Sequence, residues 1–407
     1  MKLHRSRRSS AEWAVRIASA LATASIGYFA VTTSLAEVVR RSDPAQAHDL
    51  APGDGRITAH LAEQAFKKRP SGDIHSVAAR LARLAVRQDA TAVSAITTLA
   101  AQAQLRGDTR EARRLATYSQ LLSRRDLQTQ LWFIEDAVSR NDVPGALHHY
   151  DIALRTSRAA SALLYPVLAQ ALAEPEVRAN LVTTMTKKPA WGPTFLAYAL
   201  GGKAAPRDLA DLFYGMRAAG APVAPEASAS LIGRLLLHNA PEDAWRYYAS
   251  LRTGLDQRRS RDPRFSADPA SPSQFDWLTA ADDDLAVSIQ RSGSGGVVDF
   301  SVPSGRGGVL LSQAQMLPPG EYRFSGEGHG IDQPDVSLPY WTLSCRDGRE
   351  LGRIVVPRSL NGASTFTGQF IVPSDCRSQV LALIARPTDS VAGFTGQISR
   401  AELVPAG

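Results

Sequence analysis

The stretch of sequence that decides the fold is residues 106–112, which read R-G-D-T-R-E-A. The same pattern returns 34 residues later, where residues 140–146 read R-N-D-V-P-G-A. Gly and Asn favour the end of a helix, whereas Asp, Thr and Pro favour the first turn of the next one. Each copy therefore predicts a junction between two helices, and the spacing predicts helical hairpins that repeat along the chain.

Two later phrases share this spacing. Residues 206–210 read P-R-D-L-A, and residues 240–244, again 34 positions on, read A-P-E-D-A. Each of the four phrases ends on an alanine, whose small side chain lets two helices approach closely. We therefore expect one equivalent position on the second helix of successive hairpins to hold Ala112, Ala146, Ala210 and Ala244.

The pattern resembles the tetratricopeptide repeat (TPR) over about residues 56–258. The corresponding register places units at 58–92, 93–126, 127–160, a degenerate unit near 161–190, then 191–224 and 225–258. Residues 47–54 are similar to the end of a half repeat, so the helical region is expected to span 48–258. The chain departs from the family in lacking its first-helix Trp, because the matching positions are Ile96, Gln130, Thr194 and Ser228.

The TPR resemblance implies a concave groove, lined by the first helix of each hairpin, that holds a peptide or a helix of a protein partner. The alternative is that these positions pack against a neighbouring turn or against the C-terminal domain. In the register above, the groove would contain Thr97, Gln104, Gln128, Leu131, Glu135, Phe195 and Leu236.

The N-terminal segment has the composition of a membrane anchor. Residues 17–36 carry no charge, and 20 helical residues span roughly 30 Å, the thickness of a hydrocarbon core. Residues 1–16 are basic, which predicts a cytoplasmic tail, a single-pass anchor over 17–39 in the inner membrane and export of the rest. The alternative is a cleaved signal peptide, although the small-residue site at 45–47 lies far downstream for one.

The C-terminal third has a different texture. Residues 259–272 contain three prolines and predict a linker. The domain that follows, residues 273–407, has short β-rich runs separated by Gly and Pro, which favours a sandwich or barrel. The expected strands are 285–289, 297–302, 309–312, 321–325, 340–345, 354–356, 365–372, 380–385 and 396–403. The fold class is therefore multidomain α + β, with an anchor helix, a TPR-like solenoid and a jelly-roll-like sandwich.

Two phrases in this region carry a second resemblance. Residues 317–324 read L-P-P-G-E-Y-R-F and turn sharply into a strand, and residues 275–277 read F-D-W. They are similar to the jelly-roll modules often attached to carbohydrate-active enzymes, over residues 275–404. The resemblance implies glycan contacts by exposed rings, for which the candidates are Trp277, Tyr340 and Trp341. The alternative is that these rings form the core of the sandwich.

Both cysteines of the chain, Cys345 and Cys376, lie in this domain. Two cysteines confined to one exported domain predict a disulfide. Closing a loop of about 30 residues would stabilise the fold by roughly 3–4 kcal/mol in the chain-entropy model.

The net charge of +7 is unevenly distributed, because residues 271–407 hold 10 Arg and Lys against 14 Asp and Glu. We interpret the basic excess elsewhere as solvated helix faces and expect no nucleic-acid partner. The sequence lacks G-x-x-x-x-G-K, G-x-S-x-G, H-E-x-x-H and C-x-x-C motifs, so no catalytic residue, cofactor or metal is predicted. Residues 282–284, D-D-D, are interpreted as a solvated turn, with a Ca²⁺ site as the alternative.

These observations favour a non-enzymatic, membrane-anchored adaptor of the cell envelope. Its repeats would hold a protein partner, its sandwich would bind glycan or a second partner, and cell-surface polysaccharide assembly or export is the expected setting. One alternative is an enzyme acting on envelope glycan, with the sandwich as its accessory module, because paired carboxylates brought together by folding leave no local motif. The other is a purely structural protein.

Overall fold

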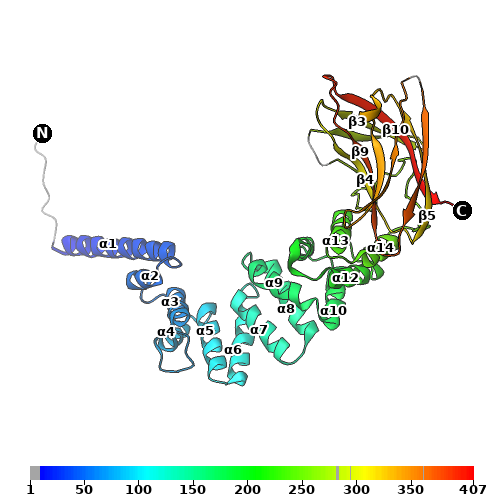
Figure 1. Cartoon of the computed structure of the whole chain (residues 1–407). Helices are drawn as coiled ribbons and strands as arrows, with labels where there is room; N and C mark the ends of the chain where they lie inside the picture. Colours follow the sequence, from blue (N-terminus) through cyan, green and yellow to red (C-terminus); the bar gives the residue numbers. More distant parts are fainter. Residues whose placement is uncertain (1–9, 281–283, 294, 361) are drawn as a thin grey trace, which may run out of the picture. The chain divides into compact units, whose positions relative to one another are not determined.

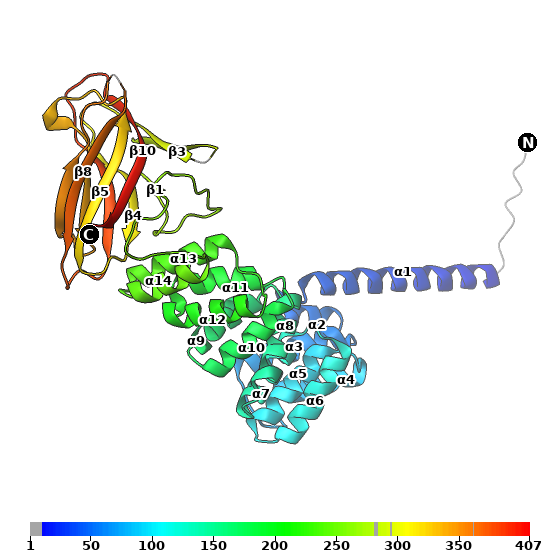
Figure 2. The ribbon, with the colours of Figure 1, turned by 90° about the vertical axis from the view of Figure 1, so that its right-hand side faces the viewer.

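The computed structural model describes residues 10–280, 284–293, 295–360 and 362–407. The chain divides into two compact units, one ending at Leu164 and one running from Tyr165 to Gly407. Figures 1 and 2 show helices in the first unit, and helices followed by a β-sandwich in the second. The division falls inside one helix and not at the expected linker, so five further helices belong to the same unit as the sandwich.

The first unit is helical throughout its described part. Its helices pack as the pairs α3/α4, α5/α6 and α7/α8, and α5 also contacts α3 and α7, the first helices of the neighbouring pairs. The pairs α5/α6 and α7/α8 fall within the expected repeats 93–126 and 127–160, whereas α3 begins three residues before the expected repeat 58–92. The bounds are α1 (Ser10–Val39), α2 (Pro44–Leu50), α3 (Gly55–Lys68), α4 (Val77–Gln88), α5 (Val93–Leu105), α6 (Thr109–Leu122), α7 (Leu127–Ser139) and α8 (Val143–Thr156).

The two phrases that set the repeat are helix junctions, as predicted. The Asp108 carboxylate accepts a hydrogen bond from the backbone N–H of Glu111, and the Asp142 carboxylate accepts one from Gly145. Gly107 and Asn141 take the left-handed backbone that ends the preceding helix, with φ of 84° and 58°. The predicted turn chemistry is therefore confirmed at both sites, and the pairs α5/α6 and α7/α8 are joined in the same way.

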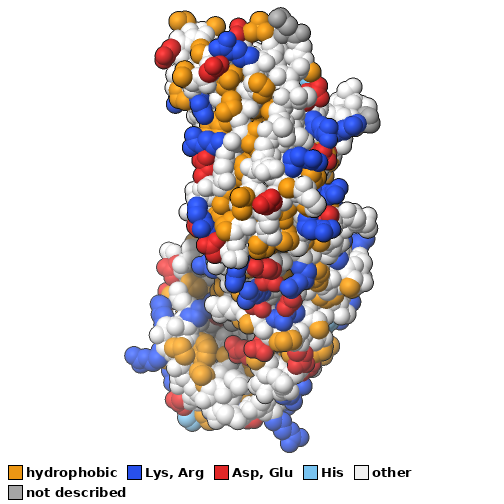
Figure 3. Space-filling model, turned by 45° about the vertical axis from the view of Figure 1, so that its right-hand side comes forward, with side chains coloured by type: hydrophobic (Ala, Val, Ile, Leu, Met, Phe, Trp, Pro, Cys, Tyr) orange, Lys and Arg blue, Asp and Glu red, His pale blue; other side chains and the backbone are white. Residues whose placement is uncertain are grey.

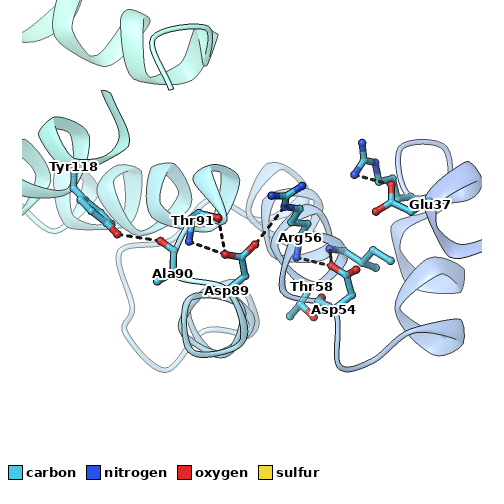
Figure 4. Close-up of polar contacts among 10 residues, drawn as sticks. Glu37, Asp54, Arg56, Thr58, Asp89, Ala90, Thr91 and Tyr118 are labelled. Carbon is cyan, nitrogen blue, oxygen red and sulfur yellow. Dashed lines mark hydrogen bonds and ion pairs between the residues drawn. The ribbon is translucent and has the colours of Figure 1, made fainter. Parts of the chain in front are cut away.

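The junction between α4 and α5 shows how polar side chains tie adjacent hairpins together (Figure 4). The Asp89 carboxylate accepts hydrogen bonds from the backbone and the hydroxyl of Thr91 at 2.8 and 2.6 Å, and Arg56 of α3 approaches it at 3.3 Å. The Tyr118 hydroxyl of α6 donates to the Ala90 carbonyl at 3.2 Å. Side chains from α3 and α6 thus meet at the turn between α4 and α5.

The helix α1 is 30 residues long and begins seven residues before the expected anchor. Its most apolar stretch has a mean hydropathy of 1.5, and none of that stretch is buried. By length and composition α1 can cross a membrane, although a signal sequence meets the same criteria. The C-terminal end of α1 is packed, because Ala36 forms a buried cluster with Ala47, Ala51 and Ile57.

In the second unit α13 packs against α14 within the expected repeat 225–258, whereas α12 packs mainly against α10 of the preceding repeat, and α9 crosses the boundary between units. The bounds are α9 (Ala160–Ala171), α10 (Pro175–Thr186), α11 (Gly192–Tyr198), the π-helix η1 (Ala199–Lys203), α12 (Pro206–Ala218), α13 (Pro225–Leu237) and α14 (Pro241–Ser250).

Each of the four alanines expected to be equivalent is buried near the start of its helix. Ala112, Ala146 and Ala244 are each buried at the fourth residue of their helices. Ala210 is also buried but is the fifth residue of α12, where Leu209 takes the fourth position. The difference arises because α12 begins at its proline, Pro206, whereas the aligned residue of α14 is the N-cap, and Ala210 is still buried.

The C-terminal domain is an antiparallel β-sandwich, and each of the nine expected strands is present. The strands are β1 (Leu278–Thr279), β2 (Ala286–Ser292), β3 (Gly295–Val302), β4 (Gly308–Gln315), β5 (Gly320–His329), β6 (Tyr340–Cys345), β7 (Glu350–Val355), β8 (Ser364–Val372), β9 (Gln379–Ala385) and β10 (Phe394–Pro405), with a 3₁₀ turn, η2 (Asp335–Ser337), before β6. The two-residue β1 was not predicted.

The strand order is that of a jelly roll. One sheet has the order β1-β4-β9-β6-β7 and the other β2-β3-β10-β5-β8. When the outermost strands β1 and β2 are left aside, the first half of the remaining strands is β3–β6 and the second half is β7–β10. Strands from these two halves alternate in each sheet, as two interlocked Greek keys require. The inward side chains form one core, in which the Phe324 ring lies 5.1 Å from Trp341 and 6.0 Å from Phe370.

The predicted disulfide is confirmed. Cys345 ends β6 and Cys376 precedes β9, and their Cα atoms lie 5.6 Å apart. Both residues are buried in the core. The bond therefore joins a strand end to the loop that leads into the neighbouring strand.

Residues 259–272 are not a free linker, which corrects the expectation. Ser260 donates its backbone N–H to the Leu403 carbonyl, the Pro263 carbonyl accepts from Ala401, and Phe265 is fully buried. The segment thus supplies hydrogen-bond partners for β10 beyond its pairing with β3. Prolines are compatible with this role because the carbonyl of a proline still accepts where only its N–H is missing.

A buried arginine from this segment joins the sandwich to α14. Arg261 is 8 % exposed, and its guanidinium donates to the carbonyls of Phe275, at 2.7 Å, and of Ala314. Its Cζ lies 5.3 Å from the Trp245 ring of α14 and 5.5 Å from the Phe275 ring. The helices and the sandwich of this unit therefore share an aromatic core around one cation.

Candidate binding surfaces

One cavity of the first unit brings together most of the residues that were expected to line a groove. This cavity, of about 510 Å³, lies between α3, α5 and α7, the first helices of three hairpins. It is also lined by apolar side chains, among them Phe66, Leu105 and Trp132. Five of the seven predicted groove residues line it together: Thr97, Gln104, Gln128, Leu131 and Glu135.

The groove combines this apolar lining with acidic groups. Glu63 accepts from Lys67 at 2.6 Å and lies 3.5 Å from the His60 ring. The hydrogen bond from His60 lowers the pKa of Glu63 to about 2, and the hydrogen bond and positive charge of Lys67 act in the same direction. This carboxylate therefore stays ionised. Glu135 is exposed and forms no ion pair within the described ranges. The groove therefore suits an amphipathic segment that carries a basic side chain.

The other two predicted groove residues lie elsewhere, which corrects the prediction. Phe195 of α11 is fully buried, with its ring 5.5 Å from Tyr165 and 6.1 Å from Trp191. Leu236 of α13 is 1 % exposed. Both side chains point into the core between the helices of the second unit, so neither faces a groove.

The second unit has a different cavity that the sequence did not reveal. It has a volume of about 780 Å³ and lies between η1 and α13. The π-helix is held by Arg234 of α13, which donates to the carbonyls of Ala199 and Ala204 at 2.8 and 2.9 Å. The available signal was the pair Gly201-Gly202, whose second residue has φ of 117°.

The aromatic candidates of the sandwich are divided between its core and its surface. Trp341 is fully buried and Trp277 is 7 % exposed, and their rings lie 5.8 Å apart. The structure therefore contradicts sugar stacking on these two rings, because their bulk is needed to fill the core between the sheets. Tyr340 is partly exposed on the outer face of the β1-β4-β9-β6-β7 sheet.

Strand register defines what surrounds Tyr340. It is paired with Ile384 of β9 and Val355 of β7, and Val309 of β4 lies beyond Ile384. The next outward row across the same strands holds Ser312, Ala382, Thr342 and Arg353, and the row after it includes Val380 and Ser344. We call this surface, from Val309 to Arg353, the outer sheet face. It combines an apolar strip with hydroxyl groups.

Two arginines cover the Tyr340 ring. The Cζ atoms of Arg353 and Arg386 lie 4.7 and 4.8 Å from its centroid. Arg353 is paired with Thr342, two residues after Tyr340, whereas Arg386 follows β9 beyond Ile384. The two guanidinium groups therefore approach the ring from opposite directions along the strands. Tyr340 is a ring held between cations and not the free stacking platform that the sequence predicted.

Neither arginine was predicted from the sequence. Arg353 is an exposed residue on an edge strand and Arg386 lies in a loop, so each alone resembles an ordinary solvated charge. The available signal was the period-two alternation of β6, which places Tyr340 outward and makes its neighbours on β7 and β9 relevant.

A third cavity, of about 700 Å³, lies beside the start of the sandwich and contains three carboxylates. Each of these is already engaged. Asp276 accepts from Tyr248 at 2.8 Å and from Arg252 at 3.0 Å, Asp262 accepts from the backbone of Ser266 and Ala267, and Asp268 pairs with Arg291. These acids hold the turn and α14 in place.

No cluster of three or more metal-ligating side chains is present among the described residues. Asp282 and Asp283, considered for Ca²⁺, lie outside the described part of the chain. Basic and acidic side chains are interspersed on the molecular face shown in Figure 3.

Comparisons with family models and with curated proteins give no match. Among solved structures, the chain is similar to the CBM22-1 xylan-binding domain of Paenibacillus barcinonensis Xyn10C (12 % identity, TM-score 0.26, 38 % of this chain and 96 % of that one) and to a CBM4 structure (13 %, 0.27, 37 % and 99 %). A similarity to the enzymatically active domain of bacteriophage CBA120 tailspike protein 4 (10 % identity, TM-score 0.25) covers 32 % of this chain and only 19 % of that one. At these values the likenesses carry no argument about function, which rests on the geometry.

Proposed function

We propose that this chain is a non-enzymatic, membrane-anchored protein of the cell envelope whose sandwich binds polysaccharide on the outer sheet face. The observation that carries the proposal is the composition of that face, in which an apolar strip, one partly exposed ring and several hydroxyl groups share a single surface. Sugar sites combine apolar lining with a few orienting polar groups in the same way. The opposite sheet also presents hydroxyl groups outward, but it adds charged side chains, such as Arg323, Glu327 and Glu402, and its described residues present no Phe, Tyr or Trp ring there.

The location follows from two features. The helix α1 would serve as a single-pass anchor of the inner membrane, with the basic residues 1–16 in the cytoplasm. The disulfide between Cys345 and Cys376 supports an oxidising compartment for the sandwich. The anchor would hold both units outside the cytoplasm, where an envelope polysaccharide is assembled or exported.

The helical hairpins would supply the adaptor function. We propose that they form a TPR-like solenoid and that the cavity between α3, α5 and α7 holds an amphipathic helix of a protein partner. Trp132 and Leu131 would contact its apolar side, and Glu135 would pair with a basic side chain.

The enzymatic alternative is disfavoured by the state of the carboxylates in the third cavity. A general acid or base must be able to reach a substrate proton. Asp276 accepts four hydrogen bonds, from Tyr248, Arg252 and both the backbone and hydroxyl of Ser273. These contacts support a structural role for this acid.

The test is polysaccharide binding by the full chain in detergent, measured by affinity electrophoresis against a panel of neutral and charged envelope polysaccharides. Tyr340→Ala should weaken the retardation by at least one polysaccharide, while Ile371→Ala, on the outer face of the opposite sheet, should leave it unchanged. Retardation by none of the panel, or an equal loss in both variants, would reject the proposed site.

A further inference from the structure

From the two arginines on the outer sheet face we infer that the polysaccharide it binds is acidic, with carboxylates on its sugars, as in a polyuronate. This inference rests on the proposed function and names the ligand class for the same face. The net charge of the domain alone would predict that it repels an acidic polysaccharide, because residues 271–407 carry more acidic than basic side chains. The distribution of these charges between the two sheets resolves the difference.

Part of the acidic charge of the domain lies on the opposite sheet. The outward positions of β3, β5 and β10 hold four carboxylates and two arginines: Asp299, Glu321, Glu327, Glu402, Arg323 and Arg400. On the outer sheet face the balance is reversed, because Arg353 and Arg386 face a single carboxylate, Glu350. A polyanion would therefore be attracted to one sheet and repelled by the other.

The two arginines differ in how far their charge is already compensated. Arg353 forms a two-pronged ion pair with Glu350, with N–O distances of 2.5 and 2.9 Å. Arg386 makes one hydrogen bond, from Nη1 to the Val336 carbonyl at 3.2 Å, and has no carboxylate partner within the described ranges. Its guanidinium therefore keeps donors and an unneutralised charge beside the Tyr340 ring.

The Tyr340 ring restricts the position of the Arg386 guanidinium before a ligand binds. A guanidinium stacked on a ring loses less side-chain freedom when it binds a ligand, and its planar fork matches the two oxygens of a carboxylate. The partly exposed hydroxyls of Ser312 and Ser344 lie on the same face, where they can meet sugar hydroxyls. Arg386 would thus bind the carboxylate while the sheet contacts the sugar ring.

The test compares one ligand in two charge states. Calorimetric titrations of the full chain in detergent, at about 0.15 M salt to screen long-range attraction, would use an oligogalacturonate and its methyl ester. The acid should bind, and the ester should bind at least tenfold more weakly. Arg386→Gln should reduce affinity for the acid about tenfold, equivalent to the loss of one charge-assisted contact. Arg386→Lys, which keeps the charge without the fork, should fall between the two.

The control is Arg323→Gln, which removes an exposed arginine from the opposite sheet and should leave binding unchanged. An equal loss in this variant would show unspecific attraction and overturn the inference. Equal binding of acid and ester, weakened by Tyr340→Ala but not by Arg386→Gln, would also overturn it while leaving the sandwich a polysaccharide-binding domain. If neither ligand binds and the polysaccharide panel also fails, the proposed function itself falls.

Discussion

Replacing Arg261 with Leu should destabilise the second unit through the core that joins α14 to the sandwich. The substitution removes both side-chain hydrogen bonds from the guanidinium and leaves the carbonyls of Phe275 and Ala314 without those donors. An unsatisfied buried acceptor costs about 1–3 kcal/mol. The lost contacts with the Trp245 and Phe275 rings add to this cost.

One term acts in the opposite direction. Burial lowers the pKa of Arg261 to about 10, so the native state holds this cation in an unfavourable environment. Leucine removes that desolvation cost, which reduces the net loss to about 2–4 kcal/mol of unfolding free energy. For a unit of this size each kcal/mol lowers the melting temperature by roughly 2–4 °C.

The assay is thermal unfolding of the full chain, followed by near-ultraviolet circular dichroism, with limited proteolysis at a temperature below the transition. Arg259→Leu is the matched control, because Arg259 is an exposed neighbour whose side chain pairs with Asp256. It should change the melting temperature little, whereas Arg261→Leu should lower it and expose the segment before Phe265 to cleavage. Equal stability of the two variants would show that the Arg261 guanidinium does not stabilise the contact between α14 and the sandwich, and would leave the packing of the aromatic rings as its cause.

Three further outcomes are expected. Ala146→Leu should lower the unfolding free energy by about 1–3 kcal/mol in urea denaturation, because the buried fourth position of α8 has no room for a larger side chain; an unchanged midpoint would reject close packing there. Burial, and to a smaller extent repulsion from His148, lowers the pKa of His149 to about 4. Between pH 4 and 6.5 the unfolded chain therefore binds more protons than the folded chain, and the unfolding free energy should fall by about 1–2 kcal/mol as the pH drops through that range. His149→Phe should flatten this pH dependence of the melting temperature, and a profile equal to that of the native chain would contradict the assignment. Under non-reducing mass spectrometry Cys345 and Cys376 should be found linked, and Cys376→Ser should lower stability by roughly 3–4 kcal/mol; two alkylatable thiols in the native protein would contradict the bond.

The helical hairpins and the strands could be predicted because their signals are local. The glycine and asparagine at residues 107 and 141 end one helix, and the aspartate that follows begins the next through its own side chain. Likewise, β-rich runs between turn residues predicted nine strands that the structure contains. Relative to its phrase, α12 begins one residue earlier than α14, because Pro206 stands one place earlier than Pro241 and both occupy the first helical position.

The role of residues 259–272 could not be predicted because it depends on distant partners. Its prolines and charges indicate a linker when considered alone. Arg261 is buried through contacts with Gln313 and Ala314, more than 50 residues away, and Ser260 is paired with Leu403. A local pattern carries no information about such partners.

The aromatic candidates show a limit that the sequence could have overcome. Tyr340 and Trp341 are consecutive residues of β6, and consecutive residues of a strand face opposite sides of the sheet. The two rings therefore cannot line the same binding face. The choice between them required the fold, because only the second sheet shows that Trp341 is on the inner side.

The most direct test of the proposed site is methyl NMR of the full chain in detergent, during titration with a polysaccharide that retards the chain in affinity electrophoresis. Val309, Val355 and Ile384 carry methyl groups on the outer sheet face, and Ile371 carries one on the outer face of the opposite sheet. With increasing ligand, the methyl signals of Val309, Val355 and Ile384 should shift while those of Ile371 stay in place. Shifts at Ile371 without shifts at Val309, Val355 and Ile384 would contradict the proposed site.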